Sequence, residues 1–219
     1  MDLIDAILST CAVRRFRPEP LDDEDVRTCL RAAVQAPSGG NIQPWQFVVV
    51  TDADTRRAIG AVYRRAYDRY EPAMAAIRPP ARSSDEEVAF ERMRRSARYL
   101  AEHLGEAPVL VLVCMPAISM TLTDAEGPLD VGTPYASVYP AVQNLMLAAR
   151  ALGIGTTLTT VYRIYQEEVR RLCAVPDRYE IVALVPMGRP VHGPTAFRPR
   201  PRRPADTVTH WNRWGARTR

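Results

Sequence analysis

The sequence of 219 residues contains no lysine, and all 29 of its basic residues are arginine. This absence excludes every mechanism that needs a lysine amine, such as a Schiff base, a pyridoxal phosphate anchor or the lysine of a phosphate-binding loop. Cysteine is also scarce, and no two of the four cysteines lie closer than 18 residues apart. The spacings of a metal site and of a redox CxxC pair are therefore missing, and we expect reduced thiols.

Long hydrophobic runs and a secretory signal are lacking as well. The first residues (MDLID) have neither the basic flank nor the apolar stretch of a signal peptide. The longest strongly apolar run, residues 108–118, is interrupted by Pro116 and is too short to span a bilayer. We therefore expect a cytoplasmic protein that makes no contact with a membrane.

The composition indicates one folded domain over residues 1–219, with 47% hydrophobic and 25% charged residues. The net charge of +4 is unevenly distributed. From Arg189 to the end there are eight arginines and a single acid, Asp206, so this tail carries +7 and the remainder carries −3. Because the basic charge is confined to the tail, we do not expect a nucleic-acid-binding body.

The hydrophobic periodicity predicts an α+β fold. Helices are expected over residues 22–36, 52–70, 86–104, 135–152 and 166–173, and strands over residues 46–51, 109–114, 156–161 and 181–187. Asp22 is placed to cap the first of these helices, with Asp25 in capping-box position.

Three of these predicted segments have distinct surroundings. The strand over 109–114 is continuously apolar, so we expect it to be covered on both faces. The helix over 135–152 is apolar almost all round and needs a partner surface. Residues 121–134 are expected to form a loop, and the proline-rich chain beyond Gly188 an extended tail.

Two segments in the first 50 residues carry candidate chemistry. Residues 36–46 (APSGGNIQPWQ) combine two glycines, which allow close approach of a ligand, with the polar side chains of Ser38 and Asn41. The same residues also suit a helix-to-strand turn with positive φ. The arginines at 14, 15 and 17 suit a phosphate or an electron-rich ring, or else form a solvated surface run.

Two further segments lie in the second half. Residues 151–160 (ALGIGTTLTT) turn sharply from a helix into a hydroxyl-rich segment. Residues 197–204 (FRPRPRRP) either bind an anion or form a nonspecific electrostatic arm. Trp211 and Trp214 follow, and both need a surface on which to be buried.

Taken in order and spacing, these segments resemble the nitroreductase family of FMN-dependent oxidoreductases. The resemblance covers essentially the whole chain and is carried by APSGGNxQPW, by VRRF before it, by ALGIGT and by the terminal RPRRP…VTHW. It implies a nitroreductase-like sandwich in which helices flank a central mixed or antiparallel sheet. It also implies an intertwined homodimer with FMN at the subunit interface, and an extended arm over about 189–219 that packs on the partner.

The resemblance assigns site residues by position. Arg14 matches a basic residue near the flavin N1 and C2 carbonyl, where a cation stabilises the anionic reduced flavin. The loop that approaches from the other subunit is matched by Pro37, Ser38, Gly39 and Asn41. The segment along the isoalloxazine is matched by Leu158, Thr159 and Thr160, and the phosphate-binding tail by Arg200 and Arg202.

One part of the expected cofactor site departs from the family. Thr10, Cys11 and Ala12 stand where the family often has Arg-Arg-Ser, although Cys11 and Ala12 are still expected to border the cofactor. Each charge-assisted hydrogen bond lost in this way would cost about 1.5–3 kcal/mol. The arginines that could replace it are Arg15, Arg198, Arg200 and Arg203.

The implied reaction is a ping-pong transfer of hydride from NADH or NADPH, through flavin N5, to a small electron-poor acceptor such as a nitroaromatic or a quinone. It requires no metal and no catalytic side chain, because the flavin carries the chemistry. Residues 63–70 and 121–135 are expected to cover the flavin and select the acceptor.

Alternatives with the same fold are an enzyme that fragments reduced FMN to dimethylbenzimidazole, a dehalogenating enzyme and a flavin-storage protein with little turnover. A polyanion binder that uses the basic tail is the alternative from a different class.

Overall fold

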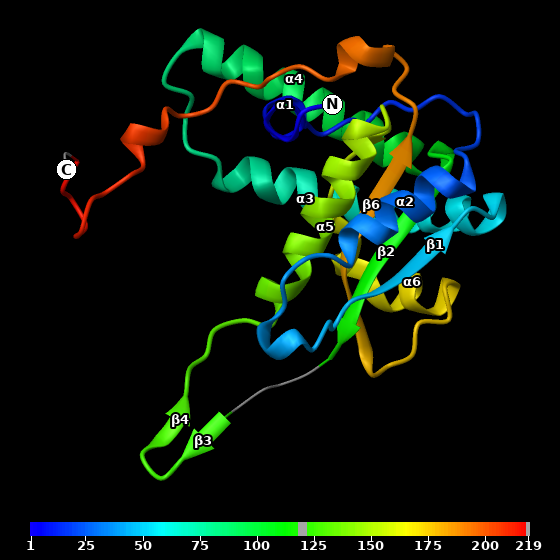
Figure 1. Ribbon diagram of the computed structural model, residues 1–219. Helices are drawn as coiled ribbons and strands as arrows, with labels where there is room; N and C mark the ends of the chain where they lie inside the picture. The colour runs from blue at the N-terminus through cyan, green and yellow to red at the C-terminus, as the bar shows by residue number, and fades with distance from the viewer. Residues whose placement is uncertain (118–121, 218–219) are drawn as a thin grey trace.

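The protein was analysed as a computed structural model, which describes residues 1–117 and 122–217 and is built around a four-stranded sheet (Figure 1). The strands are β1 (Gln46–Val50), β2 (Val109–Pro116), β5 (Gly155–Thr156) and β6 (Tyr179–Gly188). Their order is β1-β2-β6-β5, and every neighbouring pair is antiparallel. The α+β class is confirmed, and of the two expected sheet types the chain adopts the antiparallel one.

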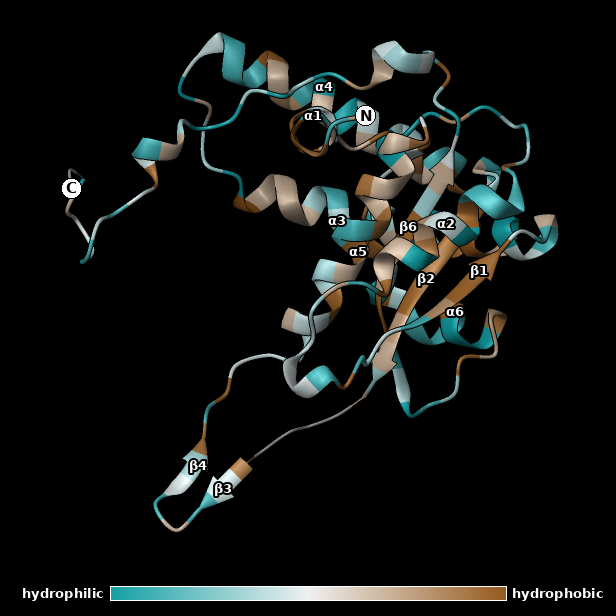
Figure 2. Ribbon diagram, viewed as in Figure 1, coloured by the Kyte–Doolittle hydropathy of each residue, from teal (hydrophilic) through white to brown (hydrophobic). Residues whose placement is uncertain are grey.

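Strand β2 separates two hydrophobic cores. Its odd-numbered residues, among them Val111 and Val113, pack with helices α2 (Asp23–Ala33) and α5 (Tyr135–Ala151). Its even-numbered residues, among them Leu110 and Leu112, pack with α3 (Ala53–Ile77), α4 (Ser84–His103) and α6 (Gln166–Leu172). The expectation that this strand is covered on both faces is therefore confirmed, and Figure 2 shows its hydrophobic colour along the centre of the molecule.

Helices α2 and α3 begin after aspartates that can be identified as N-caps from the sequence. Asp22 accepts a hydrogen bond from the Glu24 amide at 2.8 Å, and Asp52 accepts one from the Thr55 amide at 2.8 Å. Asp25 does not complete a capping box but pairs with Arg189 at 2.7 Å. A further short helix, α1 (Leu3–Ser9), was not predicted; it is capped by Asp2 and exposes most of its apolar side chains.

The predicted strand over 156–161 is wrong beyond Thr156. Thr159 makes one isolated bridge to Leu184, and the chain then enters a 3-10 helix, Val161–Tyr165. The physical reason is Tyr162, which is completely buried and donates its hydroxyl to the Ile181 carbonyl at 2.7 Å. Burying this large ring below the sheet turns the segment away from a regular ladder.

The predicted loop over 121–134 is also wrong in part. Residues 122–129 form a hairpin of β3 (Leu122–Asp124) and β4 (Gly127–Leu129), whereas Thr121 lies outside the described residues. The predicted end of the helix at residue 70 is wrong as well, since α3 continues through Pro72 to Ile77. The side chains of Asp68 and Glu71 both pair with Arg98 of α4, which holds the helix together around the proline.

The C-terminal arm and the β3–β4 hairpin both project from the body (Figure 1). The arm is extended, as expected, with short 3-10 turns at Gly193–Ala196 and Ala205–Thr207. Trp214 stacks on His210 but remains 90% exposed. Among the helices that the structure describes, none has the length and apolar character needed to traverse a bilayer.

The buried ring of Tyr162 supports a stability prediction. Tyr162→Phe should lower the free energy of unfolding by about 0.5–1.5 kcal/mol, because it removes one hydrogen bond while Arg163 still donates to the Ile181 carbonyl at 3.0 Å. Tyr162→Ala should cost about 3–5 kcal/mol, because it leaves a cavity. Urea unfolding checks both values, and similar losses in the two variants would contradict the assigned role of the ring.

Candidate active site

The N-terminal segment 11–17 lies against the edge of the sheet and thereby positions Arg14. The Val13 amide donates to the Thr156 carbonyl at 2.9 Å, and the Arg17 amide donates to the Arg189 carbonyl at 2.8 Å. A Cβ atom on Gly155 would lie 2.6 Å from Val13 Cγ1, which is closer than such atoms approach. Only glycine therefore lets the segment lie this close to β5.

A strongly basic hollow, the arginine cavity, opens beside this segment. It has a volume of about 450 Å³ and is lined by Ala12, Val13, Arg14, Arg15, Ser96, His192, Thr195, Ala196, Arg198 and Arg200. The lining contains four guanidinium groups and no carboxylate. Arginine is suited to this role because its planar fork matches the oxygens of a phosphate.

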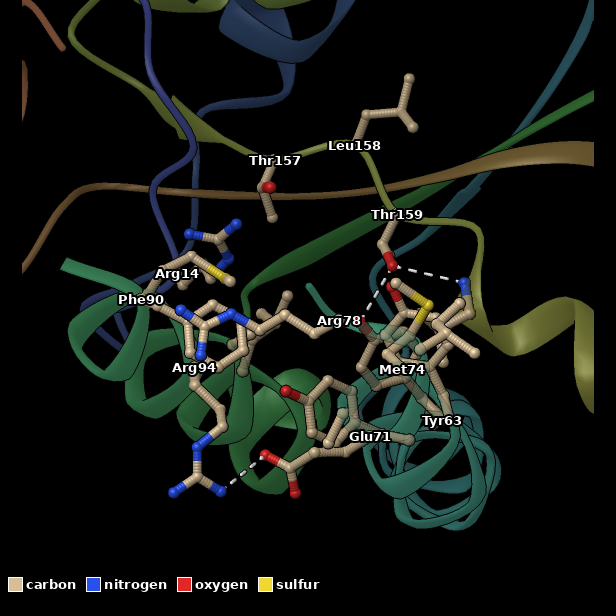
Figure 3. Close-up of a pocket in the computed structure, with 18 of the residues that line it drawn as sticks. Arg14, Tyr63, Glu71, Met74, Arg78, Phe90, Arg94, Thr157, Leu158 and Thr159 are labelled. Carbon is tan, nitrogen blue, oxygen red and sulfur yellow. Dashed lines mark hydrogen bonds and ion pairs between the residues drawn. The ribbon is translucent and has the colours of Figure 1, made fainter. Parts of the chain in front are cut away.

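A second hollow, the tyrosine cavity, lies between α3, α4 and residues 157–161. It measures about 410 Å³, and its lining includes Arg14, Tyr63, Tyr67, Tyr70, Glu71, Met74, Arg78, Phe90, Met93, Arg94, Thr157, Leu158, Thr159 and Val161. Figure 3 shows Thr157, Leu158 and Thr159 along one side, with Met74 and Glu71 of α3 on another. Arg14 lines both cavities, so the two lie next to each other with Arg14 between them.

The electrostatics of the site centre on Arg14. This half-buried side chain forms no hydrogen bond or ion pair with any residue that the structure describes. Burial lowers its pKa, but an arginine remains charged at neutral pH. A cation without a carboxylate partner at the junction of two cavities is a binding group for an anionic or electron-rich ligand.

The tyrosines opposite Arg14 are neutral. Burial raises the pKa of Tyr63, and burial together with the nearby Glu71 carboxylate raises the pKa of Tyr67 to about 12. The Tyr63 hydroxyl also shares a hydrogen bond of 2.9 Å with Thr159 Oγ1. The cavity therefore offers fixed, uncharged phenols over the whole physiological pH range.

The segment 157–160 presents backbone groups to the site. The Thr159 amide donates to the Leu184 carbonyl at 2.9 Å and is already satisfied. The amides of Leu158 and Thr160 have no acceptor within the described residues, and Leu158 is 37% exposed. Of these two residues, Leu158 lines the tyrosine cavity, so its N–H group is available to a ligand bound there.

The predicted loop residues Pro37, Ser38 and Gly39 lie elsewhere, in a third hollow of about 520 Å³ that we call the loop cavity. Asn41 belongs to the same turn and has a positive φ of 55°. Both groups can be placed along strand β6. The turn leads into Gln46 of β1, which pairs with Cys114 of β2, and Cys114 in turn pairs with Ile181 of β6. Arg14 follows Val13, which is bonded to Thr156 of β5, and Thr156 pairs with Met187 of β6. At about 3.3 Å per residue, six residues of β6 separate the two groups by about 20 Å.

Of the other predicted site residues, some line the arginine or the tyrosine cavity and some line neither. Ala12 and Arg200 line the arginine cavity, with Arg15 and Arg198 as the additional arginines. Cys11 is buried beneath it, and its thiol lies 3.4 Å from the Ala196 carbonyl. Thr160, Arg202 and Arg203 line neither cavity.

Sequence reasoning missed the contribution of α4. Phe90, Met93 and Arg94 of this helix close the tyrosine cavity opposite residues 157–159. Their spacing at i, i+3 and i+4 places them on one helical face, but such a stripe usually marks an ordinary core contact. The tyrosines within residues 63–70 do line the cavity, as was expected of that segment.

The contact between Gly155 and Val13 leads to a prediction for the site. Gly155→Ala should destabilise the fold by about 1–3 kcal/mol, because the new methyl group overlaps a stiff β-branched side chain. A double variant, Gly155→Ala with Val13→Ala, should recover part of this loss. Thermal unfolding of the two variants measures the difference, and no recovery would contradict the steric explanation.

Comparison with known proteins places the chain in one protein family. The model of the nitroreductase family matches residues 7–189. A 5,6-dimethylbenzimidazole synthase from Rhodospirillum rubrum is 34% identical over 179 residues, covering 81% of this chain and 77% of that protein. An NADH dehydrogenase from Thermus thermophilus is 27% identical over 214 residues, or 96% of each chain.

The same placement follows from solved structures. Iodotyrosine deiodinase bound to FMN and 3-iodo-L-tyrosine is similar to this chain with a TM-score of 0.73 and 26% sequence identity. The likeness covers 97% of this chain and all of that one. Since the family model spans most of the chain and the antiparallel α+β architecture agrees, the protein is a member of the nitroreductase family.

Proposed function

We propose that this protein is an FMN-dependent oxidoreductase that takes electrons from NADH or NADPH and passes them to a small electron-poor organic acceptor. The observation that carries the proposal is Arg14, a guanidinium that has no partner among the described residues and lies between a basic and an aromatic cavity. The basic cavity matches a phosphate, and the aromatic one matches a planar ring system. Related proteins that act on or contain flavin support this reading.

The residues present fit FMN. Arg198 and Arg200 would hold its phosphate in the arginine cavity, in place of the side chains missing at Thr10, Cys11 and Ala12. Arg198 is oriented by a hydrogen bond of 2.9 Å from Nε to the Thr195 carbonyl. Both cavities have the volumes usual for small-molecule sites.

The chain would contribute position and electrostatics. When bound, FMN supplies the two-electron chemistry. Arg14 would face the electron-rich edge of the ring system, where a positive charge favours the reduced form. The amide of Leu158, which lines the tyrosine cavity, would donate to the ligand there. The neutral tyrosines and Met74 exclude water without adding a titrating group.

We further propose that a second copy of the chain completes the site. Pro37, Ser38, Gly39 and Asn41 lie about 20 Å from Arg14 along the sheet, too far for one flavin to touch both groups within a single chain. The exposed apolar side chains of α1 and the 90% exposed Trp214 need a covering surface. In a homodimer, the partner's loop would reach the flavin, and the arm would wrap the partner.

The role of Arg14 is tested by Arg14→Gln. We expect the dissociation constant for FMN to rise by about 10-fold or more, because a charge-assisted hydrogen bond is lost. Arg64→Gln is the matched control, since Arg64 is an exposed arginine of α3 that lines none of the cavities described above. Quenching of FMN fluorescence gives both constants. A wild-type protein that fails to bind FMN would contradict the proposed function.

The assembly is tested by deleting residues 205–219, which removes both tryptophans but keeps Arg198 and Arg200. We expect the truncated protein to have the mass of a monomer, or to dimerise much more weakly, and to retain less FMN. Light scattering after size-exclusion chromatography reports the mass, and the visible spectrum reports the flavin. Unchanged dimerisation would show that the arm does not hold the subunits together.

A second candidate function is the oxygen-dependent breakdown of reduced FMN to dimethylbenzimidazole, which the relative from Rhodospirillum rubrum favours. The two functions differ in the fate of the flavin. An oxidoreductase returns FMN unchanged after many turnovers with an acceptor. Chromatography of the products after exposure of the reduced holoprotein to air separates them, because only the second function consumes FMN and yields a benzimidazole.

A further inference from the structure

A fourth hollow, the α4 cleft, lies next to the site just described. It has a volume of about 280 Å³, and its charged lining residues are Arg15, Glu71, Arg94, Arg95, Arg98 and Glu102. The cleft shares Glu71 and Arg94 with the tyrosine cavity and Arg15 with the arginine cavity. The cleft therefore lies directly beside both cavities, within reach of a long ligand bound in the tyrosine cavity.

Two of the four arginines in the cleft serve the fold. Arg98 pairs with both Asp68 and Glu71, and Arg94 pairs with Glu91 at 2.9 Å and with Glu71 at 3.5 Å. The pairs with Asp68 and Glu71 join α3 to α4, and the pair with Glu91 lies within α4. Their charges are balanced by carboxylates, so they contribute little free positive charge to the cleft.

The other two arginines, Arg15 and Arg95, have no carboxylate partner among the described residues. The Arg15 guanidinium carbon lies 3.7 Å from the centre of the Tyr99 ring. The His103 ring is also stacked on Tyr99, with 3.9 Å between the two ring centres. Arg95 and Tyr99 are four residues apart on α4 and so share one face. Both unpaired arginines therefore line the cleft, Arg15 fixed over Tyr99 and Arg95 one helical turn before Tyr99 on α4.

The unpaired arginines of the cleft are more than the phosphate of FMN requires. The single phosphate of FMN has Arg198 and Arg200 in the arginine cavity, which contains no acid. Arg95 lies outside that cavity and has no carboxylate partner among the described residues, so it is available to a second anion. Of the reactants in the proposed function, only the nicotinamide donor carries further phosphates.

We propose that the α4 cleft binds the 2′-phosphate of NADPH between Arg15 and Arg95 and makes NADPH the preferred electron donor; this rests on the proposed function. A 2′-phosphate is a monoester with nearly two negative charges and three terminal oxygens, which suits two guanidinium forks. The pyrophosphate that NADH also contains has one charge on each phosphorus. Glu102 at the rim opposes the anion and limits its affinity.

The test uses adenosine 2′,5′-bisphosphate as the probe and 5′-AMP as its counterpart without the 2′-phosphate. Isothermal titration of the FMN-saturated protein should show tighter binding of the bisphosphate. Arg95→Ala should weaken that binding by about 10-fold. Arg92→Ala is the matched control, because Arg92 is an exposed arginine on the same helix outside the cleft, and it should change binding less than about twofold.

A variant that is expected to bind the bisphosphate more tightly makes the test independent of any loss of folding. Glu102→Gln should tighten the bisphosphate by about twofold or more, because it removes a like charge beside the phosphate. In steady-state assays the ratio of kcat/KM for NADPH to that for NADH should fall in Arg95→Ala and rise in Glu102→Gln.

Equal binding of the two probes by the wild-type protein, or equal losses with NADPH and NADH in Arg95→Ala, would overturn the assignment. Failure to bind FMN would instead overturn the proposed function. The two failures are distinguishable because probe binding is measured only on protein whose visible spectrum shows bound flavin.

Discussion

The close approach of residues 11–17 to the β5–β6 edge of the sheet is the contact on which the site depends. It is possible because Gly155 leaves room for Val13, and it is held by backbone hydrogen bonds at Val13 and Arg17. Arg14 lies between these two fastened positions. The backbone therefore positions the Arg14 guanidinium between the arginine and tyrosine cavities. No carboxylate of the described residues pairs with it.

Two cavities of different character lie on either side of this point. The arginine cavity collects guanidiniums from the N-terminal segment and from the start of the arm, with no acid among its lining residues. The tyrosine cavity has phenols that burial keeps neutral, and its acid, Glu71, is engaged by Arg94 and Arg98. The two adjacent cavities thus offer different surroundings to the anionic and the planar end of the proposed ligand.

The antiparallel sheet imposes a second constraint, because it holds the two groups of candidate residues apart. A rigid β6 strand lies between Arg14 and the turn that contains Asn41. No rotation of a side chain can close about 20 Å. The projecting arm, the exposed α1 and the projecting hairpin are the surfaces that the proposed second copy would cover. The separation within one chain and the exposed apolar surface thus support the same assembly.

Much of this protein is determined by local sequence. The caps at Asp22 and Asp52, the continuous apolar run in β2 and the proline density after Gly188 act within a few residues, so the elements they predict are found. Patterns failed where long-range packing decided the outcome. The strand ends at Thr156 because Tyr162 is buried and bonded to Ile181. Helix α3 continues beyond Pro72, where ion pairs join it to α4.

The sequence by itself determined the α+β class and the segments from which the site is built, because these depend on periodicity and on the intrinsic preferences of glycine, proline and arginine. Only the tertiary structure decided which side chains meet: Arg14 with Arg200, α4 with residues 157–159, and Arg15 with Tyr99. These partners are between about 60 and 190 positions apart in the chain. Contacts at such separations depend on how the whole chain packs, and no local pattern contains them.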